Sequence, residues 1–311
     1  MRSFPRSFLT AAVLLALALC ALPAQEATDT IFRADTRIVV CHTTVIDKTG
    51  HLVTTLPQSA FTVFENKVKQ EIRRFRREDV PVSLGLVIDN SGSMRNKIEK
   101  VRAAALALVK DSNKDDEVFV VNFNDTAYLD NPKDKDFTND ITELEAALSR
   151  IDARGGTAMR DAIAMSMQHL KKGHRDKKVL VVITDGNDNS SITSLEKIMK
   201  ESHQRDVLIY GVGLLAEEER REAGRAKRAL NDLAEATGGK TFFPQSVEEV
   251  DAIAHQVAKD IRNQYIIEYS PRNAAMDGTF RAIRIAVKAP GNPSVRTRSG
   301  YYATPDAKTN K

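Results

Sequence analysis

The chain has 311 residues, of which 42% are hydrophobic and 28% are charged, a composition typical of folded globular domains. Its length allows one large domain together with a small one. The formal net charge is +4, and loss of the two arginines in an N-terminal segment that we expect to be cleaved would leave about +2. So little positive charge excludes an electrostatic nucleic-acid binder, and no nucleic-acid partner is expected.

The first 24 residues have the pattern of a signal peptide. Arg2 and Arg6 precede the apolar run Phe8–Leu22, and Ala24 offers a small residue for cleavage. The run of about 15 residues is short for a membrane span, which needs roughly 20. We therefore expect an exported protein that is periplasmic, cell-surface or secreted, with no membrane span after cleavage. A retained anchor and lipidation at Cys20 stay open as alternatives.

Short β-like segments flank a central region of a different pattern. Before that region, β-branched or alternating residues predict strands over 36–45, 61–64 and 68–75. After it, similar patterns predict strands over 265–269, 280–287 and 295–302. Because neither flank can bury a core alone, we expect 25–79 and 264–303 to form one small β-sandwich, followed by a tail over 304–311.

The central region, residues 80–263, alternates strand and helix patterns. Continuous apolar runs, typical of strands covered on both faces, lie over 82–88, 118–123, 179–183 and 207–212. Apolar residues at helical spacing predict helices over 97–110, 141–151, 158–170, 195–203, 225–236 and 247–261. This alternation predicts an α/β domain with a doubly wound, mostly parallel sheet, inserted between the two β flanks.

Five oxygen-bearing side chains come from three separated motifs of the central region. They are Asp89, Ser91 and Ser93 of a D-x-S-x-S sequence, Thr157 after two glycines, and Asp185 of a Thr-Asp-Gly sequence. Asp89 and Asp185 stand at the ends of predicted strands, and Thr157 opens a predicted helix. Since ligands of doubly wound sheets gather at the carboxyl ends of the strands, we expect all five to face one crevice.

The chemistry of these side chains indicates a site for a hard divalent cation. Hydroxyl and carboxylate oxygens, without His or Cys, suit Mg²⁺ or Mn²⁺ rather than zinc or copper. Two carboxylates at most neutralise such an ion, and the start of a helix adds partial positive charge. The ion would therefore stay electrophilic and accept an Asp or Glu carboxylate from a protein or peptide partner. We interpret the site as a binding device and not as a catalytic one.

The five residues resemble the metal-ion-dependent adhesion site of von Willebrand factor type A domains, and every position of that site is present. The resemblance implies that Ser91, Ser93 and Thr157 ligate the ion directly or by switching. It also implies that Asp89 and Asp185 largely hold the waters of the ion, while the ligand contributes an acidic oxygen. The resemblance covers well over half of the chain, from Pro81 to Asn263.

The flanks carry a second resemblance, to an exported bacterial family related to these domains. It rests on the strand-rich leader and on the segments 277–281 and 298–302, and it bears on architecture more than on activity. The sequence thus predicts an exported, metal-dependent adhesion or protein-interaction module that is not an enzyme. A structural or chaperone-like subunit of a cell-envelope assembly is one alternative. A metal-dependent phosphoesterase is another, but it would need a base or nucleophile beside the ion, and no His lies in the three motifs.

Overall fold

The computed structural model describes residues 37–149, 153–215 and 220–305. The predicted signal peptide lies outside these residues, as do the end of the predicted helix over 141–151 and most of the predicted tail. Across the described ranges, the helices lack the length and apolar character that a bilayer-spanning helix needs.

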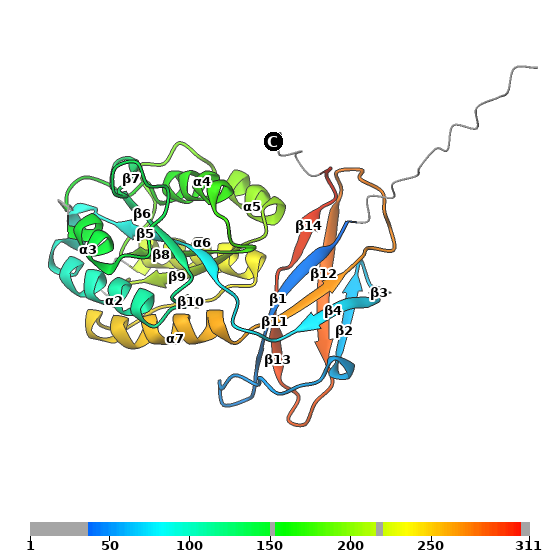
Figure 1. The fold of residues 1–311 in the computed structure, drawn as a ribbon. Coiled ribbons are helices and arrows are strands. Elements are labelled where there is room, and N and C mark those ends of the chain that lie inside the picture. The colour runs from blue at the N-terminus through cyan, green and yellow to red at the C-terminus, as the bar shows by residue number, and fades with distance from the viewer. Residues whose placement is uncertain (1–36, 150–152, 216–219, 306–311) are drawn as a thin grey trace, which may run out of the picture. The chain divides into compact units, whose positions relative to one another are not determined.

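The central region forms a six-stranded sheet of order β10-β9-β8-β5-β6-β7 (Figure 1). Five neighbouring strands are parallel, and β7 runs antiparallel to β6 at one edge. The strands are β5 (Val82–Asp89), β6 (Glu117–Phe123), β7 (Ala127–Leu129), β8 (Lys177–Thr184), β9 (Val207–Gly213) and β10 (Thr241–Phe242). The predicted fold class, an α/β domain with a mostly parallel sheet, is confirmed.

Helices cover both faces of this sheet because alternate residues of each buried strand point to opposite sides. Leu84 and Leu86 of β5 pack in the core under α2, α3 and α7, whereas Val87 packs in the core under α4, α5 and α6. The helices are α2 (Ile98–Lys110), α3 (Ile141–Ser149), α4 (Met159–His169), α5 (Leu195–Gln204), α6 (Arg220–Thr237) and α7 (Val250–Arg262). Short 3-10 turns add η1 (Gln58–Ala60), η2 (Gly92–Asn96), η3 (Leu170–Lys172) and η4 (Val247–Glu249).

The two flanks form a pair of four-stranded antiparallel sheets, β13-β1-β11-β4 and β14-β12-β2-β3, around a shared apolar core. Each sheet combines strands from before and after the central region. Their strands are β1 (Val39–Ile46), β2 (Phe61–Glu65), β3 (Val68–Gln70), β4 (Ile72–Arg76), β11 (Tyr265–Tyr269), β12 (Phe280–Val287), β13 (Ser294–Arg296) and β14 (Gly300–Tyr302). The domain limits between residues 79 and 80 and between 263 and 264 stay a prediction.

Two segments that the sequence predicted as single strands are each divided between the two sheets. Residues 68–75 become β3 in one sheet and β4 in the other, and residues 295–302 contribute to β13 and β14 in the same way. The interruption after Gln70 is a single residue, Glu71. Because so few residues separate the two strands, the whole segment has the composition of a strand. The sequence pattern therefore does not show where one strand ends and the next begins.

Candidate metal centre

The candidate site lies where the central strands end. β5 and β8 are neighbouring parallel strands, so their carboxyl ends meet at the same edge of the sheet. Asp89 is the last residue of β5, and Asp185 directly follows β8. Both side chains are buried, with the residues 0% and 1% exposed. The topology therefore brings together two carboxylates that are 96 positions apart in the sequence, the separation between numbers 89 and 185.

Four of the five predicted residues form one continuous chain of hydrogen bonds. The Ser91 amide donates to Asp89 Oδ1 over 2.8 Å, and the Ser91 and Ser93 hydroxyl oxygens lie 3.0 Å apart. The Ser93 hydroxyl in turn donates to Asp185 Oδ1 over 2.7 Å. The residues of the D-x-S-x-S motif are thus linked directly to the aspartate of the third motif.

Thr157 lies on the loop that leads into α4, and its residue is buried. This loop contacts the D-x-S-x-S loop through the Gly92 amide, which donates to the Gly155 carbonyl over 3.2 Å. The Thr157 amide donates to Asn189 Oδ1 over 2.9 Å. Among the described residues, no hydrogen bond joins the Thr157 hydroxyl to the other four predicted ligands. The two loops are connected by backbone hydrogen bonds and by Arg95, whose guanidinium donates to the Ala153 carbonyl over 3.4 Å.

The glycines before Thr157 are needed for the shape of its loop. Gly155 has a φ of +75°, and a Cβ placed on it would lie 2.1 Å from Asp125 Oδ2. A Cβ on Gly156 would lie 2.3 Å from the Ser190 hydroxyl oxygen. The Gly156 amide donates to Asp125 Oδ1 over 2.7 Å. Side chains at either position would push the loop away from Asp125 and from the segment after β8.

The two aspartates have different electrostatic surroundings. Burial raises the pKa of Asp89 to about 6, against hydrogen bonds from Thr184 and Ser91 that lower it. Asp89 forms no ion pair within the part of the chain that the structure describes. Asp185, in contrast, pairs with Lys97, whose Nζ lies 2.8 Å from Asp185 Oδ2. The site therefore holds one carboxylate with a cationic partner and one without.

Sequence reasoning gave no role to two residues that contact the aspartates. The Thr184 hydroxyl donates to Asp89 Oδ2 over 2.6 Å, and it belongs to the Thr-Asp-Gly motif that identified Asp185. Lys97 stands four positions after Ser93, at the start of the predicted helix over 97–110. That spacing could place Lys97 beside the site, but a cation is not an expected neighbour in a cation site.

The oxygen donors fit a hard divalent cation. In the described residues there is no group of three or more His, Cys, Asp or Glu side chains that could hold a metal ion. The predicted set contains only two carboxylates and relies on hydroxyls for the rest, which is compatible with Mg²⁺ or Mn²⁺ and their retained waters. The unpaired Asp89 carboxylate leaves negative charge for such an ion to offset.

The fold and the site together define an α/β domain in which hydroxyls and carboxylates gather where parallel strands end. The family model of the von Willebrand factor type A domain matches residues 84–256, which is more than half of the chain. The chain therefore belongs to the von Willebrand factor type A domain family.

Known proteins similar to the chain share parts of it. Inter-alpha-trypsin inhibitor heavy chain H4 of Sus scrofa is 26% identical over 231 residues, which is 67% of this chain and 23% of that protein. Integrin alpha-11 of Mus musculus is 36% identical over 86 residues, 26% of this chain and 7% of that protein. The chain thus spans less than a quarter of the length of either relative.

A solved structure supports the fold over a larger share of the chain. The von Willebrand factor type A protein from Catenulispora acidiphila superposes with a TM-score of 0.52 and covers 88% of this chain and 75% of that one. The sequence identity is 15%, so this likeness concerns the fold alone.

Proposed function

We propose that this protein is an exported binding module that captures an acidic group of a protein or peptide partner through a divalent cation, Mg²⁺ or Mn²⁺. In this proposal Ser91, Ser93 and Thr157 supply hydroxyl ligands, and Asp89 and Asp185 orient the waters of the ion. The bound ion would supply a Lewis-acidic position for the carboxylate of the partner. No chemical conversion of the partner is part of the proposal.

The observation that carries the proposal is the hydrogen-bonded chain that runs from Asp89 through Ser91 and Ser93 to Asp185. It places oxygens from two distant motifs at one edge of the sheet. The relatives also support a binding role, since one is named an integrin and another an inhibitor heavy chain. Export rests on the N-terminal sequence pattern.

Calorimetric titration of Mg²⁺ and Mn²⁺ into the purified chain tests the site. We expect saturable heat that is lost in Asp89→Asn and reduced in Ser93→Ala. Asp89→Asn keeps the shape of the side chain while removing its charge, so the thermal midpoint without metal should change little. Asp232→Ala, which removes an exposed acid on α6, is the matched control and should bind like the parent chain. Absence of heat in the parent chain would exclude the metal site.

Peptide display tests the partner class. A random peptide library is selected on immobilised chain in Mg²⁺ and eluted with EDTA. The recovered peptides should be enriched in Asp and Glu, and selection on Asp89→Asn should recover none above background. Peptides that remain bound to the chain in EDTA, or eluted peptides without acidic residues, would instead favour a structural subunit that associates without metal.

A further inference from the structure

A pocket of about 630 Å³ lies at the amino ends of the strands, away from the candidate metal centre. Lys177, the first residue of β8, lies in its lining, whereas the metal centre adjoins the other end of the same strand. Val80 and Pro81 before β5 line it as well. Its volume is within the range of roughly 300–1,000 Å³ typical of sites for small molecules.

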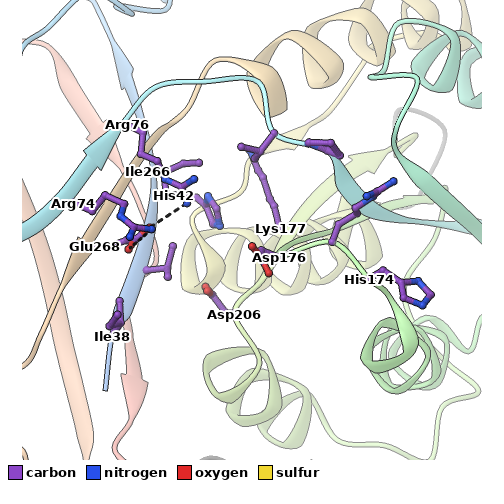
Figure 2. A pocket seen from close by; sticks show the side chains of 14 residues that line it. Ile38, His42, Arg74, Arg76, His174, Asp176, Lys177, Asp206, Ile266 and Glu268 are labelled. Atoms are coloured by element: carbon purple, nitrogen blue, oxygen red, sulfur yellow. Dashed lines mark hydrogen bonds and ion pairs between the residues drawn. The ribbon is translucent and has the colours of Figure 1, made fainter. Parts of the chain in front are cut away.

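The facing wall comes from three neighbouring strands of one sandwich sheet. Figure 2 shows His42 of β1, Arg74 and Arg76 of β4 and Glu268 of β11 on this wall, with Lys177 across from them. The pocket is therefore enclosed by the start of the α/β sheet on one side and by the sandwich on the other, and a ligand held there would contact both.

Three nitrogen-bearing side chains of this pocket have unused hydrogen-bonding capacity. Lys177 is 3% exposed, and in the described ranges its ammonium donates only to the Ile261 carbonyl over 2.6 Å, with no carboxylate paired to it. His42 is 7% exposed, and its Nδ1 has no partner there. The Arg175 guanidinium likewise makes no hydrogen bond or ion pair with any described residue, and its Nε is buried.

Two of the acidic residues in the lining are already committed to other cations. Glu268 pairs with Arg76 over 3.1 Å and with Arg74 over 3.7 Å. Asp206 pairs with Arg298 over 2.7 Å. These two carboxylates are therefore not counterions for Lys177 and Arg175. The third acidic residue of the lining, Asp176, is exposed and forms no ion pair with either of them in the described ranges.

Burial of an unpaired ammonium is unfavourable, and it lowers the pKa of Lys177 to about 7. A bound anion would compensate that buried charge. A planar guanidinium matches the oxygens of phosphate, and an ammonium is a common phosphate contact. With an imidazole N–H as a further donor, the pocket has nitrogen donors with unused hydrogen-bonding capacity on both of its walls.

We propose that this pocket binds a phosphate group, with Lys177, Arg175 and His42 as its donors. The volume leaves room for an ester as well as for the free ion. Both sources present the same oxyanion to the pocket, and the experiment separates them.

The test is calorimetric titration of inorganic phosphate and, separately, of glycerol 3-phosphate into the full chain in EDTA, at constant ionic strength. EDTA removes any contribution of the candidate metal centre, so the outcome is independent of the proposed function. We expect saturable binding with one site, and whichever compound binds more tightly identifies the source as free phosphate or an ester. The affinity should fall roughly tenfold or more in Lys177→Met, because a charged hydrogen bond is lost.

Arg175→Met is the second variant, and since this residue is only half-buried and makes no side-chain bond, its loss should leave the fold intact. Lys48→Met, which removes one exposed positive charge elsewhere, is the matched control and should bind like the parent chain. Absence of saturable binding of both compounds to the parent chain would overturn the proposal. Equal affinities of the parent chain and the folded Arg175→Met variant would also overturn it.

Discussion

At the residue scale, removal of the Lys97 side chain tests the proposed metal binding separately from folding. Its ammonium lies 2.8 Å from Asp185 Oδ2, and the side chains of the pair are 13% and 0% exposed. Lys97 therefore compensates a buried carboxylate, and under the proposed function it would compete with a divalent cation for that carboxylate. Removal of Lys97 should therefore destabilise the metal-free protein and strengthen the binding of a divalent cation.

We predict that Lys97→Met lowers the free energy of unfolding in EDTA by about 3 kcal/mol, because Asp185 is left buried without a cation. The same change should raise the affinity for Mg²⁺ roughly tenfold, since one positive charge beside the ion is lost. Urea unfolding in EDTA and calorimetry with Mg²⁺ measure the two quantities.

Lys100→Met is the control for Lys97→Met, since Lys100 lies three residues further along the chain, in α2, but pairs with the exposed Glu248. It should change neither quantity by more than a few tenths of a kcal/mol. If Lys97→Met weakened Mg²⁺ binding instead, Lys97 would be a support of the site and not a competitor.

The sequence located four residues that the structure links by hydrogen bonds, but not their surroundings, and the role of these residues as metal ligands stays a prediction. Asp89, Ser91, Ser93 and Asp185 could be found because motif spacing and strand ends are local properties of the chain. Lys97 and Thr184 received no role, since their contacts with the aspartates depend on how η2 and β8 come together. Such side-chain contacts depend on how separate elements pack together, and a single sequence motif does not contain that information.

At the scale of elements, Lys177 joins the start of β8 to the last turn of α7 through its bond to the Ile261 carbonyl. Burial lowers the pKa of this ammonium from 10.5 to about 7 in the folded chain. Between these two values the unfolded chain binds one proton more than the folded chain. The free energy of unfolding therefore rises with pH across this window. Below about pH 7 Lys177 is protonated in both states, so none of this gain is present.

We predict that the parent chain gains about 2 kcal/mol of unfolding free energy between pH 7.5 and pH 9.5 from Lys177 alone. Lys177→Met should remove this gain and flatten the profile, while Lys48→Met should keep it. Urea unfolding at a series of pH values, in phosphate-free buffer, measures the difference between the variants. Parallel profiles for the parent chain and Lys177→Met would show that the ammonium is not destabilised by burial.

Within the α/β sheet, the strands with a long, regular pattern were predicted from the sequence, and the two shortest were not. β5, β8 and β9 are continuous apolar runs because helices cover both of their faces. β7 and β10 contain three and two residues, which is too short for any periodicity to emerge. Their pairing depends on the neighbouring strands β6 and β9, so only the assembled sheet defines them.

At the scale of the whole molecule, the two β flanks depend on each other and the α/β domain does not share their core. β1 pairs with β11 and β13, and β4 pairs with β11, so the partner strands of these N-terminal strands are C-terminal. The end of β1 also forms an isolated bridge to Leu52 of its own flank. More than half of the buried residues of the sandwich core also come from the C-terminal flank. Both cores of the α/β domain are built from residues between 82 and 261.

We therefore predict that a chain ending at Asn263 keeps a folded α/β domain but loses the order of its N-terminal flank. Without β11 and β13, the backbone groups of β1 lack their ladder partners, and the apolar side chains of β1 and β2 lose the core that covers them. Limited proteolysis should then cleave within 37–79 and leave a resistant fragment close to 80–263. A control chain ending at Pro305 should resist cleavage in both regions. Protection of 37–79 in the shorter chain would mean that the N-terminal flank folds alone, and collapse of the resistant fragment would mean that the α/β domain requires the sandwich for its stability.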